Sequence, residues 1–185
     1  MYATQDFRNG LKILYEGEPY VIVEFQHVKP GKGNAFTRTK IKSLVSGRVL
    51  EPTLKSGEKV GIPDVEDREM QYLYREADHY TFMDTKSYDQ VLIDRANLGQ
   101  SADLMPENVT CQILFWNGRA IGVQLPNFVN IKIAECEPGV RGDTATGATK
   151  PAKLETGGQV NVPLFVNEGE SIKIDTRDGS YVERV

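Results

Sequence analysis

Apolar and polar residues alternate in short runs along most of this chain, and turn-forming residues separate the runs. Alternation with a period of two puts successive side chains on opposite faces, as in a half-buried β-strand. Many short strands separated by turns are typical of small β-barrels. The runs that predict strands are residues 11–14, 20–25, 36–44, 49–54, 70–75, 80–84, 108–116, 119–125, 128–134, 159–162, 171–175 and 181–185.

The spacing of these runs predicts an all-β protein with three small barrels in tandem, at residues 1–63, 64–126 and 127–185. For domains the size of the second and third, the five-stranded OB-fold is the common solution. Gly61–Pro63 is the predicted linker after the first domain. Asn117-Gly118 predicts a tight hairpin turn in the second domain.

Two stretches depart from the strand pattern. Residues 91–98 predict one or two helical turns. Residues 139–151 are polar, rich in glycine and threonine, and without apolar periodicity, which predicts a surface loop.

The loop between the predicted strands 20–25 and 36–44 has the sequence V-K-P-G-K-G-N-A-F. Proline pre-sets φ, and glycine and asparagine tolerate positive φ, so this loop predicts a β-hairpin with more than two loop residues. Lys32 lies at the tip between two glycines, so no neighbouring Cβ shields its amine. The other tip-loop residues are Lys29, Pro30, Gly31, Gly33 and Asn34.

A lysine in such a turn is most often only a solvated charge. The surrounding sequence favours a function, because residues 25–50 contain no acidic residue in a chain of net charge −4. The second strand of the hairpin is expected to carry Arg38, Lys40 and Lys42 on one face. A hairpin with charge of one sign attracts polyanions, so we predict that these three cations contact the phosphates of a nucleic acid.

Charge is distributed unevenly over the three predicted domains. Residues 1–63 contain 10 lysines and arginines and 6 acidic residues, whereas residues 64–126 contain 5 and 11, and residues 127–185 contain 7 and 9. The first domain attracts phosphate and the second repels it. We therefore expect nucleic acid to bind at the N-terminal domain in a defined orientation.

Motifs of the common catalytic and cofactor sites are absent. The loop lacks G-x-x-x-x-G-K-[ST], and no G-x-S-x-G, H-E-x-x-H or G-x-G-x-x-G occurs. Cys111 and Cys136 lack metal-ligand spacing with His27 and His79, so we expect no metal or cofactor. Without a signal peptide or an apolar run of ~20 residues, we expect a cytoplasmic protein with reduced thiols. The remaining enzyme hypothesis is a Schiff base at Lys32, which requires a desolvated amine.

Four aromatic residues lie in the predicted hairpin of residues 70–84. In one interpretation they form a base-stacking platform. In the other they are barrel core and cross-strand pairs, which the acidic surroundings favour. The four are Tyr72, Tyr74, Tyr80 and Phe82.

Three segments together resemble the bacterial elongation factor P family over essentially the whole chain. This family includes the hypusine-containing translation factors of eukaryotes and archaea. The first segment is Gln5–Gly10, and the second is the tip K-P-G-K-G-N-A-F at Lys29–Phe36. The third, Gly157–Tyr181, reads G-x-x-V-x-V-P-L-F-V-x-x-G-E-x-I-K-I-D-T-R-x-G-x-Y.

The resemblance implies a KOW/SH3-like barrel followed by two OB-like barrels, in an L shape similar to tRNA. It implies binding to both ribosomal subunits between the peptidyl-tRNA and exit sites, where the factor relieves stalling at consecutive prolines. Lys32 would lie against the acceptor end of the peptidyl-tRNA and carry an extension added by a lysyl-tRNA-synthetase-like ligase. A third-domain loop, here Gly142, Asp143, Thr144 and Ala145, would approach the small subunit and mRNA.

Positioning accounts for such an activity without acid–base chemistry. Proline is a poor partner in peptide bond formation because its ring fixes φ. A factor that orders the reactants raises the rate of the step by positioning alone. We therefore predict a monomeric, non-enzymatic factor without a membrane partner; the alternative is a general single-stranded RNA- or DNA-binding OB-fold protein.

Overall fold

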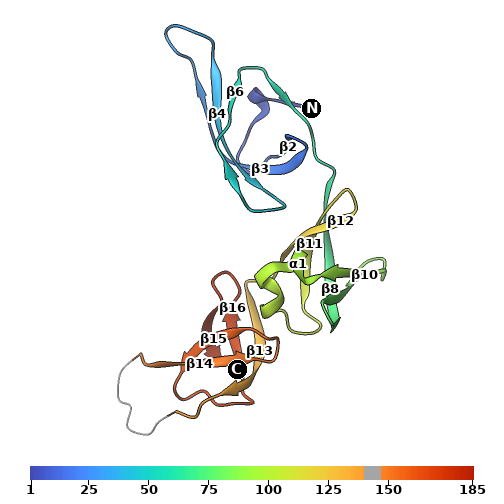
Figure 1. Cartoon of the computed structure of the whole chain (residues 1–185), viewed down its shortest axis with the longest axis vertical. Helices are drawn as coiled ribbons and strands as arrows, with labels where there is room; N and C mark the ends of the chain where they lie inside the picture. The colour runs from blue at the N-terminus through green and yellow to red at the C-terminus, as the bar shows by residue number, and fades with distance from the viewer. Residues whose placement is uncertain (140–146) are drawn as a thin grey trace. The chain divides into compact units, whose positions relative to one another are not determined.

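Strands account for most of the residues that the computed structural model of this protein describes, residues 1–139 and 147–185 (Figure 1). The all-β prediction is confirmed. None of the helices in the described residues is long and apolar enough to span a bilayer. Contacts divide the chain into two compact units, residues 1–66 with 114–122, and residues 67–113 with 123–185.

The N-terminal elements are β1 (Tyr2–Ala3), the 3₁₀ helix η1 (Thr4–Asp6), β2 (Lys12–Tyr15), β3 (Glu18–Val28), β4 (Phe36–Ser43), β5 (Val49–Leu50), β6 (Thr53–Lys55) and β7 (Lys59–Val60). Antiparallel pairing gives the sheet order β2-β3-β4-β5, with β6 also on β4, while β1 pairs with β7. The strands curl around one apolar core (Figure 1). Its buried residues are Phe7, Leu11, Ile13, Tyr20, Ile22, Ile41, Leu54 and Val60.

The predicted hairpin is formed by β3 and β4, which stay paired up to Val28 and Phe36. The register shifts between Ile22 and Glu24, so Val23 is a bulge residue and is 44% exposed. A bulge adds one residue to one strand and increases the local twist. The regular alternation of this run is therefore interrupted at Val23.

Gly61, at the start of the predicted linker, packs against the first sheet. The Leu14 N–H donates to the Gly61 carbonyl oxygen at 2.9 Å. A Cβ on Gly61 would lie 3.0 Å from Leu14 Cδ1, so a larger residue here would require the Leu14 side chain to shift. The chain enters the next strand at Val65.

The middle elements are β8 (Val65–Glu76), β9 (His79–Asp84), β10 (Gln90–Asp94), α1 (Arg95–Leu98), the 3₁₀ helix η2 (Gly99–Leu104), β11 (Thr110–Trp116) and β12 (Arg119–Gln124). They form a sheet in the order β10-β9-β8-β11-β12. The turn predicted at Asn117-Gly118 is confirmed, with φ of 51° and 78° at its two residues. Such positive φ values fit the twist of a two-residue hairpin.

The helix predicted at residues 91–98 is wrong for its first half. Residues 90–94 form β10, and only Arg95–Leu98 is α-helical. Ile93 is 3% exposed and pairs with Tyr80, whereas Leu92 is 68% exposed. This alternation has the period of a strand, and the run is too short for periodicity alone to separate it from a helix.

The C-terminal elements are β13 (Phe128–Cys136), β14 (Thr149–Leu154), β15 (Gln159–Pro163), β16 (Ser171–Asp175) and β17 (Ser180–Arg184). They pair antiparallel in the order β15-β14-β13-β16-β17. One core is filled by side chains from β13, β14, β15 and β16 and from the loop that follows β15. Its buried residues are Val129, Ile131, Ile133, Ala152, Leu154, Val160, Val162, Val166, Ile172 and Ile174.

Strand β14 was not predicted, and its first three residues fall in the predicted loop 139–151. The reason is Lys150, a polar residue on the buried face that is only 7% exposed. Its Nζ donates a hydrogen bond of 2.6 Å to the Glu137 carbonyl oxygen. A charged residue at a core position hides the apolar alternation on which strand prediction depends.

Helix η2 joins the middle elements to the C-terminal sheet within the second unit. Leu104 packs against the C-terminal core. The Thr156 hydroxyl donates to the Asp103 carbonyl oxygen at 2.5 Å. Gly158 lies against the same carbonyl group, where a Cβ would come within 2.6 Å of the oxygen. The turn between β14 and β15 therefore packs directly on η2.

Candidate nucleic-acid interface

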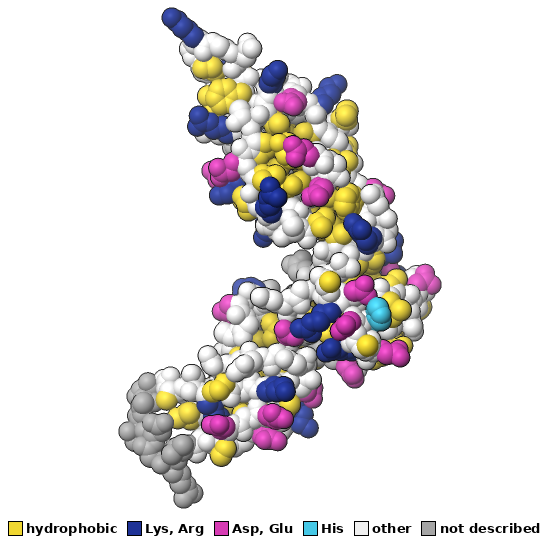
Figure 2. Space-filling model, viewed as in Figure 1, with side chains coloured by type: hydrophobic (Ala, Val, Ile, Leu, Met, Phe, Trp, Pro, Cys, Tyr) yellow, Lys and Arg dark blue, Asp and Glu magenta, His cyan; other side chains and the backbone are white. Residues whose placement is uncertain are grey.

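The tip loop, residues 29–35, connects β3 and β4 at the end of the hairpin. Residues 29–34 are all exposed. Gly33 has φ of 106°, a region that favours glycine, and a Cβ added to Gly31 would meet nothing within 4 Å. Figure 2 shows a lysine or arginine side chain at the outer end of this hairpin. The structure therefore places Lys32 at an exposed tip, where the sequence predicts it.

The base of the tip loop is tied to the rest of the first unit. The Ser56 N–H donates to the Ala35 carbonyl oxygen at 3.1 Å. The next residue, Gly57, donates its N–H to Thr4 Oγ1 at 2.8 Å, and Thr4 is 2% exposed. Sequence reasoning missed Thr4, because this contact joins residues 53 positions apart and no local pattern marks it. The tip loop therefore projects from a base that these hydrogen bonds hold in place.

The inner side of the hairpin is braced by aromatic and polar contacts. His27 Nδ1 and Thr37 Oγ1 lie 2.9 Å apart in a hydrogen bond across the two strands. The Phe25 ring packs edge-on against the His27 ring and against Phe7, with centroids 5.4 and 6.5 Å apart. These contacts hold the hairpin in one orientation relative to the barrel core.

The outer face of β4 carries the predicted cations. Residues 37, 39, 41 and 43 are buried, so Arg38, Lys40 and Lys42 share the opposite face, as predicted. Arg38 is exposed, and its guanidinium carbon lies 5.7 Å from the centroid of the Phe36 ring. Cation–π packing of this kind holds an arginine beside the tip loop without using its hydrogen-bond donors.

Two carboxylates approach these cations, which the acid-free sequence window did not suggest. Glu24 is the cross-strand neighbour of Lys40. Glu51, in the connection from β5 to β6, lines the same shallow groove of about 440 Å³, together with Arg38 and Thr53. Both acidic residues lie one position outside the window of residues 25–50. The positive charge is therefore partly compensated around Lys40 and uncompensated in the tip loop.

The aromatic residues of the middle sheet are mainly core. Tyr72, Tyr80 and Phe82 are 5%, 2% and 0% exposed, and Tyr72 packs on the other two rings at 5.6 and 5.5 Å. The core interpretation is confirmed for these three, and the stacking-platform interpretation is wrong for them. Tyr74 differs, because it is 48% exposed.

The predicted small-subunit loop, Gly142, Asp143, Thr144 and Ala145, lies outside the described residues. The described part of the chain contains no group of three His, Cys, Asp or Glu side chains that could hold a metal ion. Cys111 is buried, and burial raises the pKa of its thiol to about 12.

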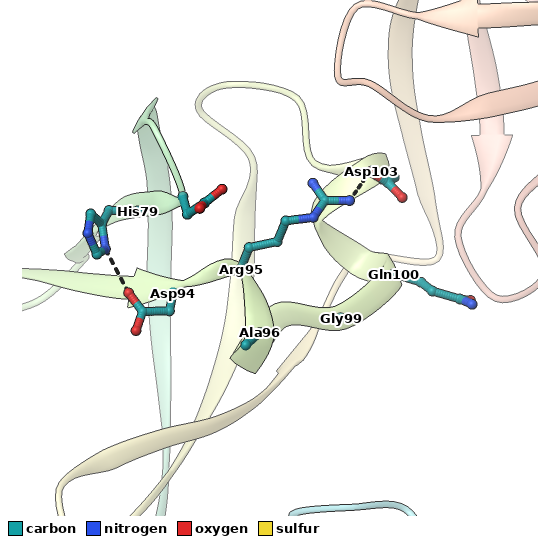
Figure 3. A pocket seen from close by; sticks show the side chains of 8 residues that line it. His79, Asp94, Arg95, Ala96, Gly99, Gln100 and Asp103 are labelled. Atoms are coloured by element: carbon teal, nitrogen blue, oxygen red, sulfur yellow. Dashed lines mark hydrogen bonds and ion pairs between the residues drawn. The ribbon is translucent and has the colours of Figure 1, made fainter.

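A second pocket lies beside α1 in the second unit (Figure 3). His79 and Asp94 point toward one another from neighbouring strands, with Nδ1 and Oδ1 2.6 Å apart. Arg95 points the other way, to Asp103 on η2 at 2.7 Å, and also donates to the Tyr80 hydroxyl at 3.2 Å. His79 thus pairs with Asp94 and Arg95 with Asp103, which is the arrangement of a structural network.

Three family models match consecutive parts of the chain. The elongation factor P KOW-like domain matches residues 3–60, the elongation factor P OB domain matches residues 65–123, and the elongation factor P C-terminal model matches residues 122–184. The KOW-like and OB-fold predictions are confirmed for the first two barrels.

Curated relatives agree over the full length. The chain is 51% identical over 185 residues to elongation factor P of Bdellovibrio bacteriovorus, covering 100% of this chain and 98% of that protein. It is also 51% identical to elongation factor P of Pelotomaculum thermopropionicum, covering 100% of both. In fold, it is similar to a translation initiation factor 5A from Methanococcus jannaschii, with a TM-score of 0.54, 20% identity, and coverage of 68% of this chain and 90% of that one. On these matches, the chain belongs to the elongation factor P family.

Proposed function

We propose that this protein binds the ribosome between the peptidyl-tRNA and exit sites and promotes peptide bond formation at consecutive prolines. Lys32 positions the acceptor end of the peptidyl-tRNA. The observation that carries this proposal is the exposed, glycine-flanked Lys32 on a loop whose base is tied to the barrel through Ser56 and Thr4.

The surroundings of Lys32 determine its contribution. Lys29 adds a second amine, and Pro30, Gly31, Gly33 and Asn34 give the loop its shape without bulky side chains. Arg38, Lys40 and Lys42 on the outer face contact RNA phosphates, which orients the hairpin but reads no sequence. A lysine amine supplies three donors at the end of a flexible stem. An extension of Lys32 by a lysyl-tRNA-synthetase-like ligase increases its reach.

The chemical contribution is one of positioning. Ordering two reactants lowers the barrier of a bimolecular step without a proton transfer from the protein. We propose accordingly that the protein is not an enzyme. The three domains are residues 1–63, 64–126 and 127–185, and the third carries the small-subunit contact at residues 142–145. The protein acts as a monomer in the cytoplasm.

The general single-stranded nucleic-acid binder is less well supported. Its stacking platform requires accessible rings, and three of the four candidate aromatics are buried. The acidic composition of residues 64–126 also opposes phosphate binding there.

Replacing the tip lysine tests the proposal. Lys32→Ala should reduce expression of a polyproline reporter to the level seen without the protein, in cells that lack their own copy. Lys59→Ala is the matched control, because Lys59 is also an exposed lysine of the first unit but lies on β7. Both variants should melt as the parent does. Normal reporter expression with Lys32→Ala refutes the role of Lys32.

The mass of the tip peptide from native cells tests the modification. An extension at Lys32 adds a defined mass to the peptide that contains it and leaves the Lys59 peptide unchanged. An unextended Lys32 in a protein that still rescues the reporter refutes the proposed modification.

A further inference from the structure

The turn between β6 and β7 lies beside the end of the tip loop. We call residues 55–58 the β6–β7 turn. Its first residue, Lys55, is the cross-strand neighbour of Phe36, where β4 begins. The next residue, Ser56, donates its N–H to the Ala35 carbonyl oxygen at 3.1 Å. The β6–β7 turn therefore holds the last residue of the tip loop.

The β6–β7 turn is in turn held by Thr4, through one hydrogen bond in each direction. The Thr4 N–H donates to the Glu58 carbonyl oxygen at 3.1 Å. The Gly57 N–H donates to Thr4 Oγ1 at 2.8 Å. Thr4 is only 2% exposed, so water has little access to this contact. A buried N–H that loses its acceptor is costly, so the hydroxyl of Thr4 restricts where the turn can lie.

Thr4 is itself anchored to the barrel core. Its carbonyl oxygen accepts a hydrogen bond of 3.2 Å from the Phe7 N–H. The Phe7 side chain is 5% exposed and packs edge-on against the Phe25 ring of β3. The helical turn around Thr4 is closed by Asp6, whose Oδ2 accepts from the Ala3 N–H at 2.9 Å. The β6–β7 turn is thus fixed to a well-packed part of the first unit.

The tip loop depends on its two ends for its position. Residues 29–34 are all exposed, and two of the six are glycines, so the loop has no core of its own. At one end, Val28 and Phe36 form the last cross-strand pair of the hairpin. At the other, Ala35 is held by Ser56. A shift of the β6–β7 turn would therefore move the whole loop.

We propose that Thr4 is a positioning residue for Lys32. Its hydroxyl fixes the β6–β7 turn, the turn fixes Ala35, and Ala35 sets where the amine of Lys32 lies. This inference rests on the proposed function, in which Lys32 orders the acceptor end of the peptidyl-tRNA. Thr4 is too deeply buried to touch RNA itself. A misplacement of about 1 Å costs as much as ~10²-fold in the rate of a step that depends on positioning.

Three variants separate the hydroxyl of Thr4 from its shape. Thr4→Val keeps the branched side chain and removes the acceptor, whereas Thr4→Ser keeps the acceptor. Thr39→Val is the matched control, because Thr39 is also 2% exposed in the first unit and lies on β4. Its Oγ1 has no hydrogen-bond partner among the residues that the structure describes. Removing that hydroxyl leaves no donor without an acceptor.

Peptide bond formation between prolines on purified ribosomes, with the full-length protein titrated, tests the proposal. Thr4→Val should lower the rate at saturating protein about tenfold. The concentration that gives half of the maximal rate should stay unchanged, because the cations on the outer face of β4 remain in place. Thr4→Ser and Thr39→Val should match the parent. The assay is run well below the melting temperature of every variant, as circular dichroism determines it.

This design distinguishes positioning from a merely structural role. A variant that is only less stable would reach the parent's rate once enough folded protein is added. The parent's maximal rate with Thr4→Val, or a loss of affinity alone, therefore overturns the proposal. So does an equal loss of rate with Thr4→Ser, since the acceptor is then not what matters.

Lys32→Ala in the same assay separates this inference from the proposed function. A slow Lys32→Ala protein beside a normal Thr4→Val protein overturns the role of Thr4 and leaves the proposed function in place. A normal rate with Lys32→Ala overturns the proposed function, and the role of Thr4 with it.

NMR of the free protein tests the mechanical link independently of the ribosome. In Thr4→Val, the amide hydrogens of Ser56 and Gly57 should exchange faster with solvent than in the parent. Backbone order parameters of residues 29–34 should fall in the same variant. Thr39→Val should change neither. Unchanged exchange at Ser56, or unchanged order parameters in the tip loop, overturns the proposed link from Thr4 to Lys32.

Discussion

Replacing Gly158 with alanine should loosen the packing of the C-terminal sheet on η2. The alanine Cβ would lie 2.6 Å from the Asp103 carbonyl oxygen and 3.1 Å from Asp103 Cβ. The nearest atom belongs to backbone, so no side-chain rotation relieves the overlap. The turn must move away from η2, and the hydrogen bond from Thr156 to the same carbonyl must lengthen or break.

The cost follows from two contributions. Forcing a carbon into a well-packed contact costs about 1–3 kcal/mol, and loss of one neutral hydrogen bond costs about 1 kcal/mol. Together they predict that the free energy of unfolding falls by about 2–4 kcal/mol. For a chain of this size, 3 kcal/mol corresponds to a fall in Tm of about 6–12 °C.

Urea unfolding of the full-length protein measures this difference, and Gly122→Ala is the matched control. Gly122 also lies outside the positive-φ region, and a Cβ added there meets nothing within 4 Å. Gly122→Ala should leave the midpoint unchanged or raise it slightly, because alanine reduces the entropy of the unfolded chain. The contrast between the two variants isolates the steric overlap at Asp103.

Thr156→Val tests whether the two contacts act together. Since Thr156 and Gly158 share one carbonyl group, the double variant should lose less stability than the sum of the single variants. A Gly158→Ala protein that unfolds at the parent's urea concentration would refute the close approach. Strict additivity would refute the shared contact while leaving the steric argument intact.

Two ionisable groups give further predictions. Because burial raises the pKa of Cys111 to about 12, iodoacetamide at pH 8 should leave this thiol unmodified until urea unfolds the protein, and mass spectrometry of the Cys111 peptide checks this. Hydrogen bonds from the Arg177 side chain and backbone lower the pKa of Asp175. This carboxylate therefore stabilises the fold above its unfolded pKa of ~3.9, and the stabilisation is lost as the pH falls through the lower folded value. Arg177→Gln should raise the pKa of Asp175 in a carbon-13 NMR titration; an unchanged value would contradict the pairing.

Elements with strong local signals could be predicted from the sequence. The turn at Asn117-Gly118 depends on two residues that tolerate positive φ, and both adopt it. The tip loop around Lys32 depends on proline and glycine in the same way. In such turns the backbone preference of each residue agrees with the fold, so nothing distant needs to be known.

Elements and contacts that no local sequence pattern indicates could not be predicted. Strand β14 places Lys150 in the core, where its amine is satisfied by the carbonyl of Glu137, a residue of the preceding connection. The contact of Thr4 with Gly57 likewise joins the first turn of the chain to the base of the tip loop. Both depend on partners that only the folded chain brings together.

The charge around the hairpin also depends on partners that only the folded chain brings together. The sequence window without acidic residues predicts a uniformly positive finger, but antiparallel pairing puts Glu24 opposite Lys40, and the groove beside it includes Glu51. At the tip, Lys29 and Lys32 lie beyond the paired strands and have no acidic neighbour within the loop sequence. The attraction for phosphate is therefore graded along the hairpin and strongest at its end. A gradient of this sign favours approach of a polyanion to the tip rather than to the side of the barrel, which is the orientation that the proposed positioning by Lys32 requires.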